Sequence, residues 1–171
     1  MKRIGLLSDT HGFFPERLFL FFDKVDEIWH AGDVGSLSLA DSLAAFRPLK
    51  AVYGNIDGHD IRLVYPQHLR FICENTDVWI THIGGYPGKY ERYVKPEIFV
   101  DPPKLFISGH SHILKIIYDS KLNFLHINPG AAGYYGFHKV CTAVRFTIDG
   151  EEIKDLEIWE MPRNEILKSI K

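Results

Sequence analysis

The sequence predicts an α/β protein in which two packed β-sheets have helices on their outer faces. Two observations support this fold class. The first part of the chain alternates apolar strand patterns with helical patterns, as parallel βαβ units do. The rest of the chain consists mostly of strand patterns separated by turn residues. The 171 residues contain no repeat and no linker-like segment, so we expect one domain over 1–171.

The βαβ units occupy the first third of the sequence. Each of the three predicted strands in this part ends in polar residues. Pro15 and the acidic Glu16 mark the start of the first helix. The second helix has apolar residues at helical spacing, with Ser36 or Ser38 as its N-cap. The predicted order is strand 2–8, helix 13–25, strand 26–33, helix 36–46 and strand 49–55.

The remaining strands follow after residue 68. A Glu-Asn-Thr-Asp turn divides 69–82 into two strands, and an Asp149-Gly150 turn separates the last two. The other predicted strands are 104–108, 113–119, 122–130, 140–148 and 153–161. Residues 86–99 are expected to form a loop with one short helix, and 162–171 a frayed, charged tail.

Charge, cysteine content and the length of the apolar runs limit the compartment and the kinds of partner that we expect. A net charge of −2 argues against the broad basic face that duplex nucleic acid requires. The two cysteines, Cys73 and Cys141, lie far apart and form no CxxC motif, which favours a reducing compartment. No apolar run approaches the length of a membrane span or of a signal peptide's apolar region. We therefore expect a cytoplasmic protein without membrane or duplex nucleic-acid partners.

Polar side chains with metal-binding groups follow five of the predicted strands. In open α/β sheets, ligands bind at the carboxyl ends of the strands, so these side chains are expected to converge. The candidates are Asp9, His11, Asp33, Asn55, His82, His110 and His112.

The chemical types of these seven residues indicate a metal site. Carboxylate, carboxamide and imidazole together suit Mn, Fe, Zn or Ni better than Ca²⁺, which prefers oxygen ligands alone. Asp9 and His11, and likewise His110 and His112, are separated by one residue. In extended backbone such pairs point to the same side and can reach a common centre. Seven donors exceed the needs of one tetrahedral ion but suffice for two ions if one carboxylate bridges them.

The motifs Asp-Thr-His, Gly-Asp, Gly-Asn, a single His and Gly-His-Ser-His occur in that order between residues 9 and 112. This pattern resembles the calcineurin-like metallophosphoesterase signature D-x-H, G-D, G-N, H, G-H-x-H. The Asn-Pro-Gly-Ala segment at 128–131 resembles a turn of the small prokaryotic phosphodiesterase branch. The resemblance implies a four-layer α/β/β/α sandwich of two mixed sheets and a phosphodiesterase acting on small phosphate esters.

The resemblance also implies a role for each candidate residue. Asp9, His11 and His112 would bind one divalent ion, Asp33 would bridge, and Asn55, His82 and His110 would bind the second. The ions are expected to be Mn²⁺, with Fe, Zn and Ni as alternatives. A bridging hydroxide would attack phosphorus in line. Among the ligands, Asp33, Asn55 and His11 are expected to act in catalysis.

The sequence departs from the family pattern after Asn55. Many family members have a histidine next, which helps to protonate the leaving group or stabilise the transition state, whereas Ile56 cannot donate a proton. His59 is a candidate substitute, and Tyr86 in the Gly-rich loop 84–93 is a candidate substrate contact. The remaining histidines are expected to have structural, metal-supporting or surface roles: His30, His68, His126 and His138.

Other functions remain open at this point. Within the enzyme class, the alternatives are a phosphomonoesterase and a nucleotide hydrolase. A different class is a metal-binding scaffold, as in the phosphoesterase-like subunit of the retromer coat, although scaffold forms replace metal ligands that this sequence keeps. Exposed edges of two sheets are compatible with a homodimer.

Overall fold

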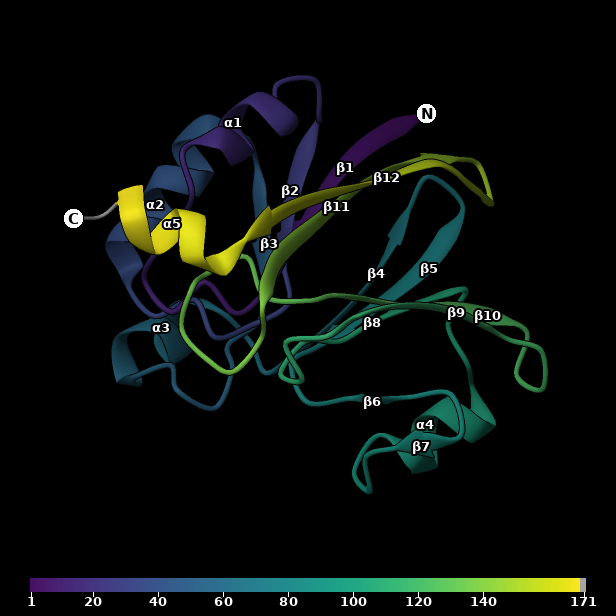
Figure 1. The fold of residues 1–171 in the computed structure, drawn as a ribbon. Coiled ribbons are helices and arrows are strands. Elements are labelled where there is room, and N and C mark those ends of the chain that lie inside the picture. The colour runs from purple at the N-terminus through teal and green to yellow at the C-terminus, as the bar shows by residue number, and fades with distance from the viewer. Residues whose placement is uncertain (170–171) are drawn as a thin grey trace.

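The computed structural model describes residues 1–169 and contains two five-stranded sheets packed face to face (Figure 1). One sheet has the strand order β12 (Glu152–Pro162), β11 (Val140–Asp149), β1 (Lys2–Leu7), β2 (Glu27–His30) and β3 (Leu49–Ala51). The other has the order β4 (His68–Cys73), β5 (Thr76–Thr81), β8 (Leu105–Ile107), β10 (Phe124–Pro129) and β9 (Leu114–Asp119).

Both sheets are mixed. β1, β2 and β3 run parallel in the first sheet, and β5, β8 and β10 run parallel in the second. The outer partners pair antiparallel: β11 with β1, β12 with β11, β4 with β5, and β9 with β10. The parallel strands therefore give each sheet a single edge where several carboxyl ends meet.

Side-chain alternation along the strands creates the layers. Ile4 and Leu6 of β1 lie in the core between the sheets, whereas Leu7 points to the helices. In the second sheet, Ile80 faces the first sheet and its neighbour Trp79 faces the opposite side. Because both faces of the central strands are covered, their sequences are apolar almost throughout.

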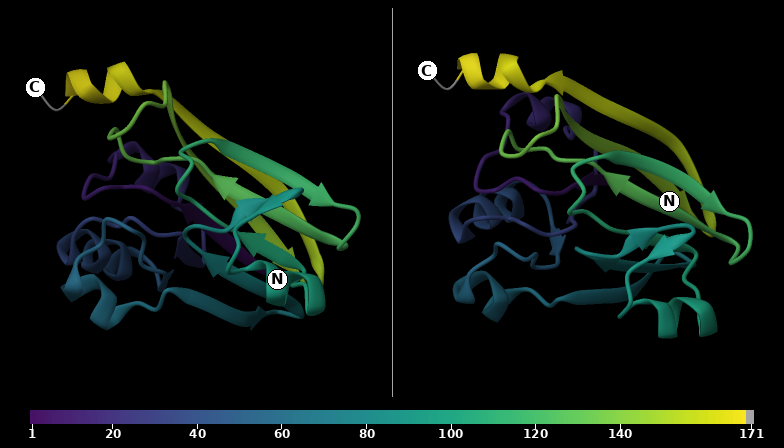
Figure 2. Two further views of the ribbon diagram at one scale, coloured as in Figure 1. Left: turned by 90° about the horizontal axis from the view of Figure 1, so that it is seen from below. Right: turned by 60° about the horizontal axis from the view of Figure 1, so that its bottom comes forward.

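The outer layers complete the predicted arrangement. α1 (Arg17–Phe21) and α2 (Leu37–Phe46) pack on the first sheet through Leu18, Phe22 and Leu43. On the opposite side, α4 (Lys95–Val100) and a hairpin of β6 (Gly85–Tyr86) and β7 (Lys89–Tyr90) cover the second sheet (Figure 2). The predicted fold class, two mixed sheets flanked by helices, is confirmed.

Two helices differ from the sequence prediction. The predicted frayed tail is wrong for 163–169, which form α5 (Arg163–Ser169). Its residue Ile166 is only 1% exposed, and the burial of this apolar side chain fixes a segment whose charges resemble a solvated tail. α3 (His59–Val64) was not predicted and packs through Ile61. No helix within residues 1–169 is long and apolar enough to cross a membrane.

Candidate metal centre

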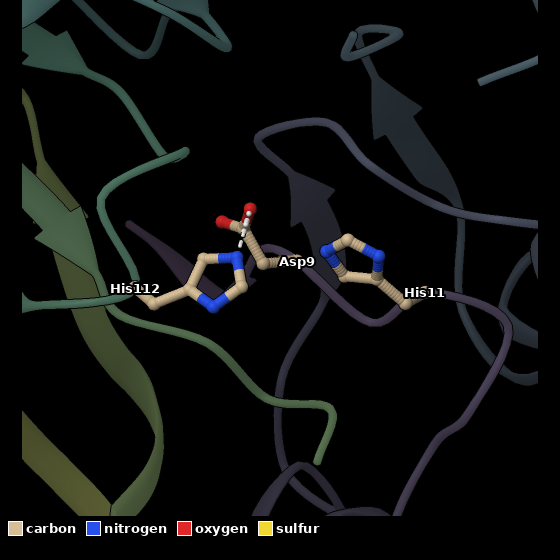
Figure 3. Close-up of side chains that lie close together, drawn as sticks. All are labelled: Asp9, His11 and His112. Atoms are coloured by element: carbon tan, nitrogen blue, oxygen red, sulfur yellow. Dashed lines mark ion pairs between the residues drawn. The ribbon is translucent and has the colours of Figure 1, made fainter. Parts of the chain in front are cut away.

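The seven predicted metal-binding residues come from both sheets and meet at the carboxyl ends of the parallel strands. The first sheet supplies the residues after β1, β2 and β3, and the second supplies those after β5 and β8. Six of the seven form two compact groups whose donor atoms lie within 4.8 Å of one another. The groups are Asp9, His11 and His112, called cluster 1, and Asp33, His82 and His110, called cluster 2. Figure 3 shows Asp9 of cluster 1 between the two imidazoles.

The backbone at these positions is left-handed rather than extended. Positive φ angles occur at eight described non-glycine residues, and five of them belong to the clusters. These five are Asp9 (φ 53°), His11 (49°), Asp33 (55°), His110 (68°) and His112 (58°). The left-handed region is uncommon for such residues and concentrates where a site is held under strain. The expected extended backbone is therefore wrong at these positions. Asp9 and His11 still share cluster 1, and His110 and His112 lie in different clusters, as the family resemblance implies.

In both Asp9 and Asp33, one carboxylate oxygen accepts hydrogen bonds from the protein and the other faces the candidate metal centre. Oδ2 of Asp9 accepts hydrogen bonds from Ser8 Oγ (2.6 Å) and the His110 amide (3.0 Å). Its Oδ1 is buried and makes no hydrogen bond. In Asp33, Oδ1 accepts a hydrogen bond from the Ile56 amide at 3.0 Å. Its Oδ2 lies 3.6 Å from His11 Nε2 and 3.2 Å from His82 Nε2, between the two clusters.

A backbone carbonyl sets the tautomer of His82. Nδ1 of this ring lies 2.8 Å from the carbonyl oxygen of Ala31, and since a carbonyl only accepts, Nδ1–H donates. In the neutral ring, Nε2 then presents a lone pair. It faces Asn55 Oδ1 at 3.1 Å and Asp33 Oδ2 at 3.2 Å. Three hydrogen-bond acceptors, His82 Nε2, Asn55 Oδ1 and Asp33 Oδ2, therefore lie close together without a donor between them.

A two-step relay sets the tautomer of His112. The carbonyl of Gly133 lies 2.9 Å from Nε2 of His138, so that nitrogen donates. Nδ1 of neutral His138 must then accept from Nδ1–H of His112, 3.2 Å away. Nε2 of neutral His112 carries a lone pair and lies 3.1 Å from the free Oδ1 of Asp9. Metal-binding histidines have this arrangement, in which the distal N–H is held by a second partner.

Burial and the mutual charges of the clusters set their ionisation. Burial alone would raise the pKa of both Asp9 and Asp33, but the neighbouring imidazoles lower it below the ordinary value. Burial lowers the pKa of His11. The pKa of His82 is raised, because the hydrogen bond to Asp33 and the charges of both carboxylates outweigh its burial. The lowered pKa values keep both carboxylates ionised.

The donor set fits divalent cations. Only four buried side-chain atoms among the described residues lack a hydrogen-bond partner, and two of them are Asp9 Oδ1 and His11 Nε2. Buried acceptors that face other acceptors are costly unless a positive charge lies between them. Carboxylate oxygens and imidazole nitrogens are borderline ligands of the kind that transition metals prefer. Cluster 1 and cluster 2 are therefore two candidate sites for divalent metal ions.

Asp57 and Gly54, which the sequence analysis interpreted as parts of a turn, fix the positions of the loops that carry the metal-binding residues. Both carboxylate oxygens of buried Asp57 accept hydrogen bonds from the amides of Val34, Gly35 and Gly54, which ties the turns after β2 and β3 together. A Cβ at Gly54 would lie 2.0 Å from Asp33 Oδ1, so this close approach requires glycine.

Asn128, predicted as part of a simple turn, lies near the end of β10 and supports the loop between the clusters. Its Nδ2 donates to the carbonyl of Gly109 (2.8 Å) and to Ser111 Oγ (3.1 Å). His30 is fully buried, and its Nε2 forms a hydrogen bond with Thr10 Oγ1 at 2.8 Å. The structural or supporting role expected for His30 agrees with this position.

A hollow of about 480 Å³ opens over the clusters. Its polar wall includes His11, Asp33, Asn55, His110 and His112, and its apolar wall is formed by Ile56, Ile113, Tyr135 and Phe137. His138 also lines it, although no sequence signal beyond its residue type separated it from the other histidines.

The two predicted substrate contacts lie elsewhere. His59 is exposed at the start of α3 and does not line this hollow. Tyr86 lines a neighbouring hollow that shares His110 with the first.

Comparisons with known proteins agree with this geometry. Residues 1–151 match the model of the calcineurin-like phosphoesterase superfamily domain. A probable metallophosphoesterase of Methanothermobacter thermautotrophicus is 32% identical over 165 residues, covering 91% of this chain and 90% of the relative.

Two solved structures share the fold at lower identity. An archaeal phosphodiesterase superposes with a TM-score of 0.66 at 20% identity, over 92% of this chain and 99% of its own. Vps29 from Entamoeba histolytica, complexed with Zn²⁺, superposes with a TM-score of 0.71 at 14% identity, over 95% of this chain and 99% of its own. The family match and the paired metal-binding clusters lead to one conclusion: the chain belongs to the calcineurin-like phosphoesterase superfamily.

Proposed function

We propose that this protein is a phosphodiesterase that uses two divalent metal ions, with Mn²⁺ as the expected pair, to hydrolyse small phosphate diesters. The observation that carries the proposal is the position of Asp33. Its free Oδ2 lies 3.6 Å from Nε2 of His11 in cluster 1 and 3.2 Å from Nε2 of His82 in cluster 2. One carboxylate oxygen between two donor groups is suited to join two ions into a phosphoester-binding clamp.

The ligands follow from the two clusters. Cluster 1, Asp9 with His11 and His112, would hold one ion. Cluster 2 would hold the other, with Asn55 as an added ligand because its Oδ1 lies 3.1 Å from Nε2 of His82. When bound, the two ions would lower the pKa of a shared water and neutralise charge on the phosphoryl oxygens.

The protein's own residues favour esters with a stable leaving group. Ile56 lines the hollow over the clusters and has no proton to give to a departing alkoxide. His138 is occupied, since Nε2–H is donated to Gly133 and Nδ1 faces His112. The apolar wall of Ile56, Ile113, Tyr135 and Phe137 fits an aromatic ester group. An aryl phosphodiester therefore matches the site better than an alkyl monoester.

The test uses metal-stripped protein and bis-p-nitrophenyl phosphate, with and without Mn²⁺. We expect hydrolysis only with added metal, and loss of at least about 10²-fold in kcat for Asp33→Asn. Asp41→Asn, an exposed position on α2, is the matched control and is expected to keep full activity. p-Nitrophenyl phosphate, assayed in parallel, separates a monoesterase from a diesterase.

The outcomes discriminate between the candidate functions. A preference for the monoester by kcat/KM would refute the diesterase and favour the phosphomonoesterase. No turnover of either ester with Mn²⁺, Fe²⁺, Zn²⁺ or Ni²⁺, in protein that is folded and binds metal, would leave the metal-binding scaffold as the function.

A further inference from the structure

A second hollow, of about 260 Å³, lies beside the metal centre under the β6–β7 hairpin. It shares His110, Ser111 and Ile113 with the hollow over the clusters, so the two adjoin at the Gly-His-Ser-His loop. A substrate whose phosphorus lies at the clusters can therefore extend into it. We call it the side hollow.

His126 gives the side hollow an unsatisfied polar group. This β10 residue lines the hollow, is 0% exposed, and has no partner at normal hydrogen-bond geometry at either ring nitrogen among the described residues, apart from a weak contact with the Phe106 backbone. Its two nitrogens are the only such buried atoms besides those of cluster 1 within residues 1–169. The ring packs against Phe106, with centroids 5.7 Å apart, so it has a fixed position. An unpaired buried N–H costs about 1–3 kcal/mol, which a bound acceptor would recover.

Two cations and a hydroxyl donor line the side hollow together with this imidazole. Lys115 Nζ lies 3.4 Å from the centroid of the Tyr86 ring, in cation–π contact, and Lys89 lies across the hairpin. Neither lysine forms an ion pair with a carboxylate among residues 1–169, and Glu91 is the one acidic residue of the lining. Ser111 Oγ accepts from Asn128 and from the Ile113 amide, so its hydroxyl proton remains free to donate. The lining thus has excess positive charge and unused donors.

We propose that the side hollow binds a second, non-scissile anionic group of the substrate, such as a phosphate monoester on the part of the diester that is not the leaving group. His126, Lys115 and Ser111 would donate to its oxygens, and Tyr86 would hold the Lys115 ammonium in place. The proposal rests on the proposed function and adds a substrate class to it: unsymmetrical diesters with an aromatic leaving group on one side and a phosphorylated arm on the other.

The two hollows make such a substrate bind in one orientation. The hollow over the clusters has four large apolar side chains, whereas the side hollow carries the lysines. A phosphate held against the apolar wall of the first hollow would lose its hydration without compensation, and an aryl group beside the lysines would leave their charges unpaired.

The test compares two chromogenic substrates that differ by one phosphate. These are the p-nitrophenyl ester of thymidine 5′-phosphate and the same compound with a 3′-phosphate. With Mn²⁺-loaded protein we expect the 3′-phosphate to raise kcat/KM by about tenfold or more, mainly through KM. Lys115→Met and His126→Phe should each reduce this ratio towards one while the unphosphorylated substrate is hydrolysed at the parent rate. Lys121→Met, at the exposed β9–β10 turn, should keep the parent ratio.

A measurement on metal-free protein gives an independent readout. Titration of inorganic phosphate into ¹³C,¹⁵N-histidine-labelled protein should shift the imidazole signals of His126, and Lys115→Met should weaken the response by about tenfold.

The results separate this inference from the proposed function. A substrate ratio near one in the parent, together with His126 signals that do not move with phosphate, would overturn the inference and leave an ordered water as the partner of His126. If no diester is hydrolysed with any metal, the proposed function fails, and the phosphate titration alone decides whether the side hollow binds anions.

Discussion

His138 is expected to control metal affinity without touching the metal. Its Nδ1 accepts from His112 Nδ1–H at 3.2 Å, and its Nε2–H is fixed by the Gly133 carbonyl at 2.9 Å. Burial lowers the pKa of His138, so it is neutral at pH 7 and can accept this proton. Replacing His138 by leucine removes the acceptor. His112 then loses both the preference for the tautomer with a lone pair on Nε2 and the restraint on its ring.

The magnitude follows from comparable metal sites. Loss of a partner that orients a ligating histidine lowers metal affinity by about 10–100-fold, which corresponds to about 1.4–2.8 kcal/mol. Because His112 belongs to cluster 1, the loss should fall on one of two binding events. Titration calorimetry of metal-stripped His138→Leu with Mn²⁺ measures both. His138→Gln keeps a carbonyl acceptor and an N–H donor and should recover part of the affinity.

The control is His59→Leu, which changes an exposed histidine on α3 and should bind Mn²⁺ as the parent does. Circular dichroism and the melting temperature of the metal-free variants establish that they are folded. If folded His138→Leu bound two Mn²⁺ ions with the parent's Kd values, the relay through His138 to His112 would be refuted. Equal weakening by the leucine and glutamine variants would also refute it, because the acceptor would then be irrelevant.

Three further predictions concern stability. Saturating metal-stripped protein with Mn²⁺ at 100 times Kd should raise Tm by about 5–10 °C in a thermal melt, and no rise would contradict the two clusters as binding sites. Asp57→Ala leaves two buried amides and one part-buried amide without their acceptor and should lower the free energy of unfolding by about 3 kcal/mol in urea, whereas exposed Asp60→Ala should cost under about 0.5 kcal/mol. Ion pairs with Lys2 and Lys50 lower the pKa of Glu27 to about 2 despite its burial, so Glu27→Gln should cost about 1–2 kcal/mol at pH 7. Because the depressed carboxyl pKa stabilises the fold only above its unfolded value, this difference should shrink as pH falls from about 5 to 2, and a difference that persists at pH 2 would contradict it.

The sequence predicted the fold class because each strand carries its own local evidence. Runs such as Ile4–Leu7 and Leu105–Ile107 are apolar at every position since both faces of these strands are buried. The α5 helix escaped prediction for the opposite reason. Among residues 163–168 only Ile166 is deeply buried, and a single buried apolar position has no periodicity to detect.

For the site, the positions of the residues were predictable but their geometry was not. Motifs after five strands located the seven candidates, because parallel strands place their carboxyl ends together. The left-handed backbone at Asp9 and His110 arises from tertiary contacts: the Oδ2 atom of Asp9 accepts the amide of His110, 101 residues away. No local pattern encodes such a contact. His138 was missed for the same reason, since its contact with His112 depends on which loop folds over it.

Neither sheet holds a complete cluster. Asp9 and His11 of cluster 1 follow β1, but their partner His112 follows β8 of the other sheet. Cluster 2 likewise combines Asp33, after β2, with His82 and His110, after β5 and β8. The distances within each cluster therefore depend on the apolar core between the sheets, so metal binding and sheet packing are thermodynamically linked. A large-to-small substitution in this core, far from any metal ligand, should therefore weaken metal affinity if it lets the two sheets shift relative to each other. Bound metal should in turn stabilise the core against local unfolding.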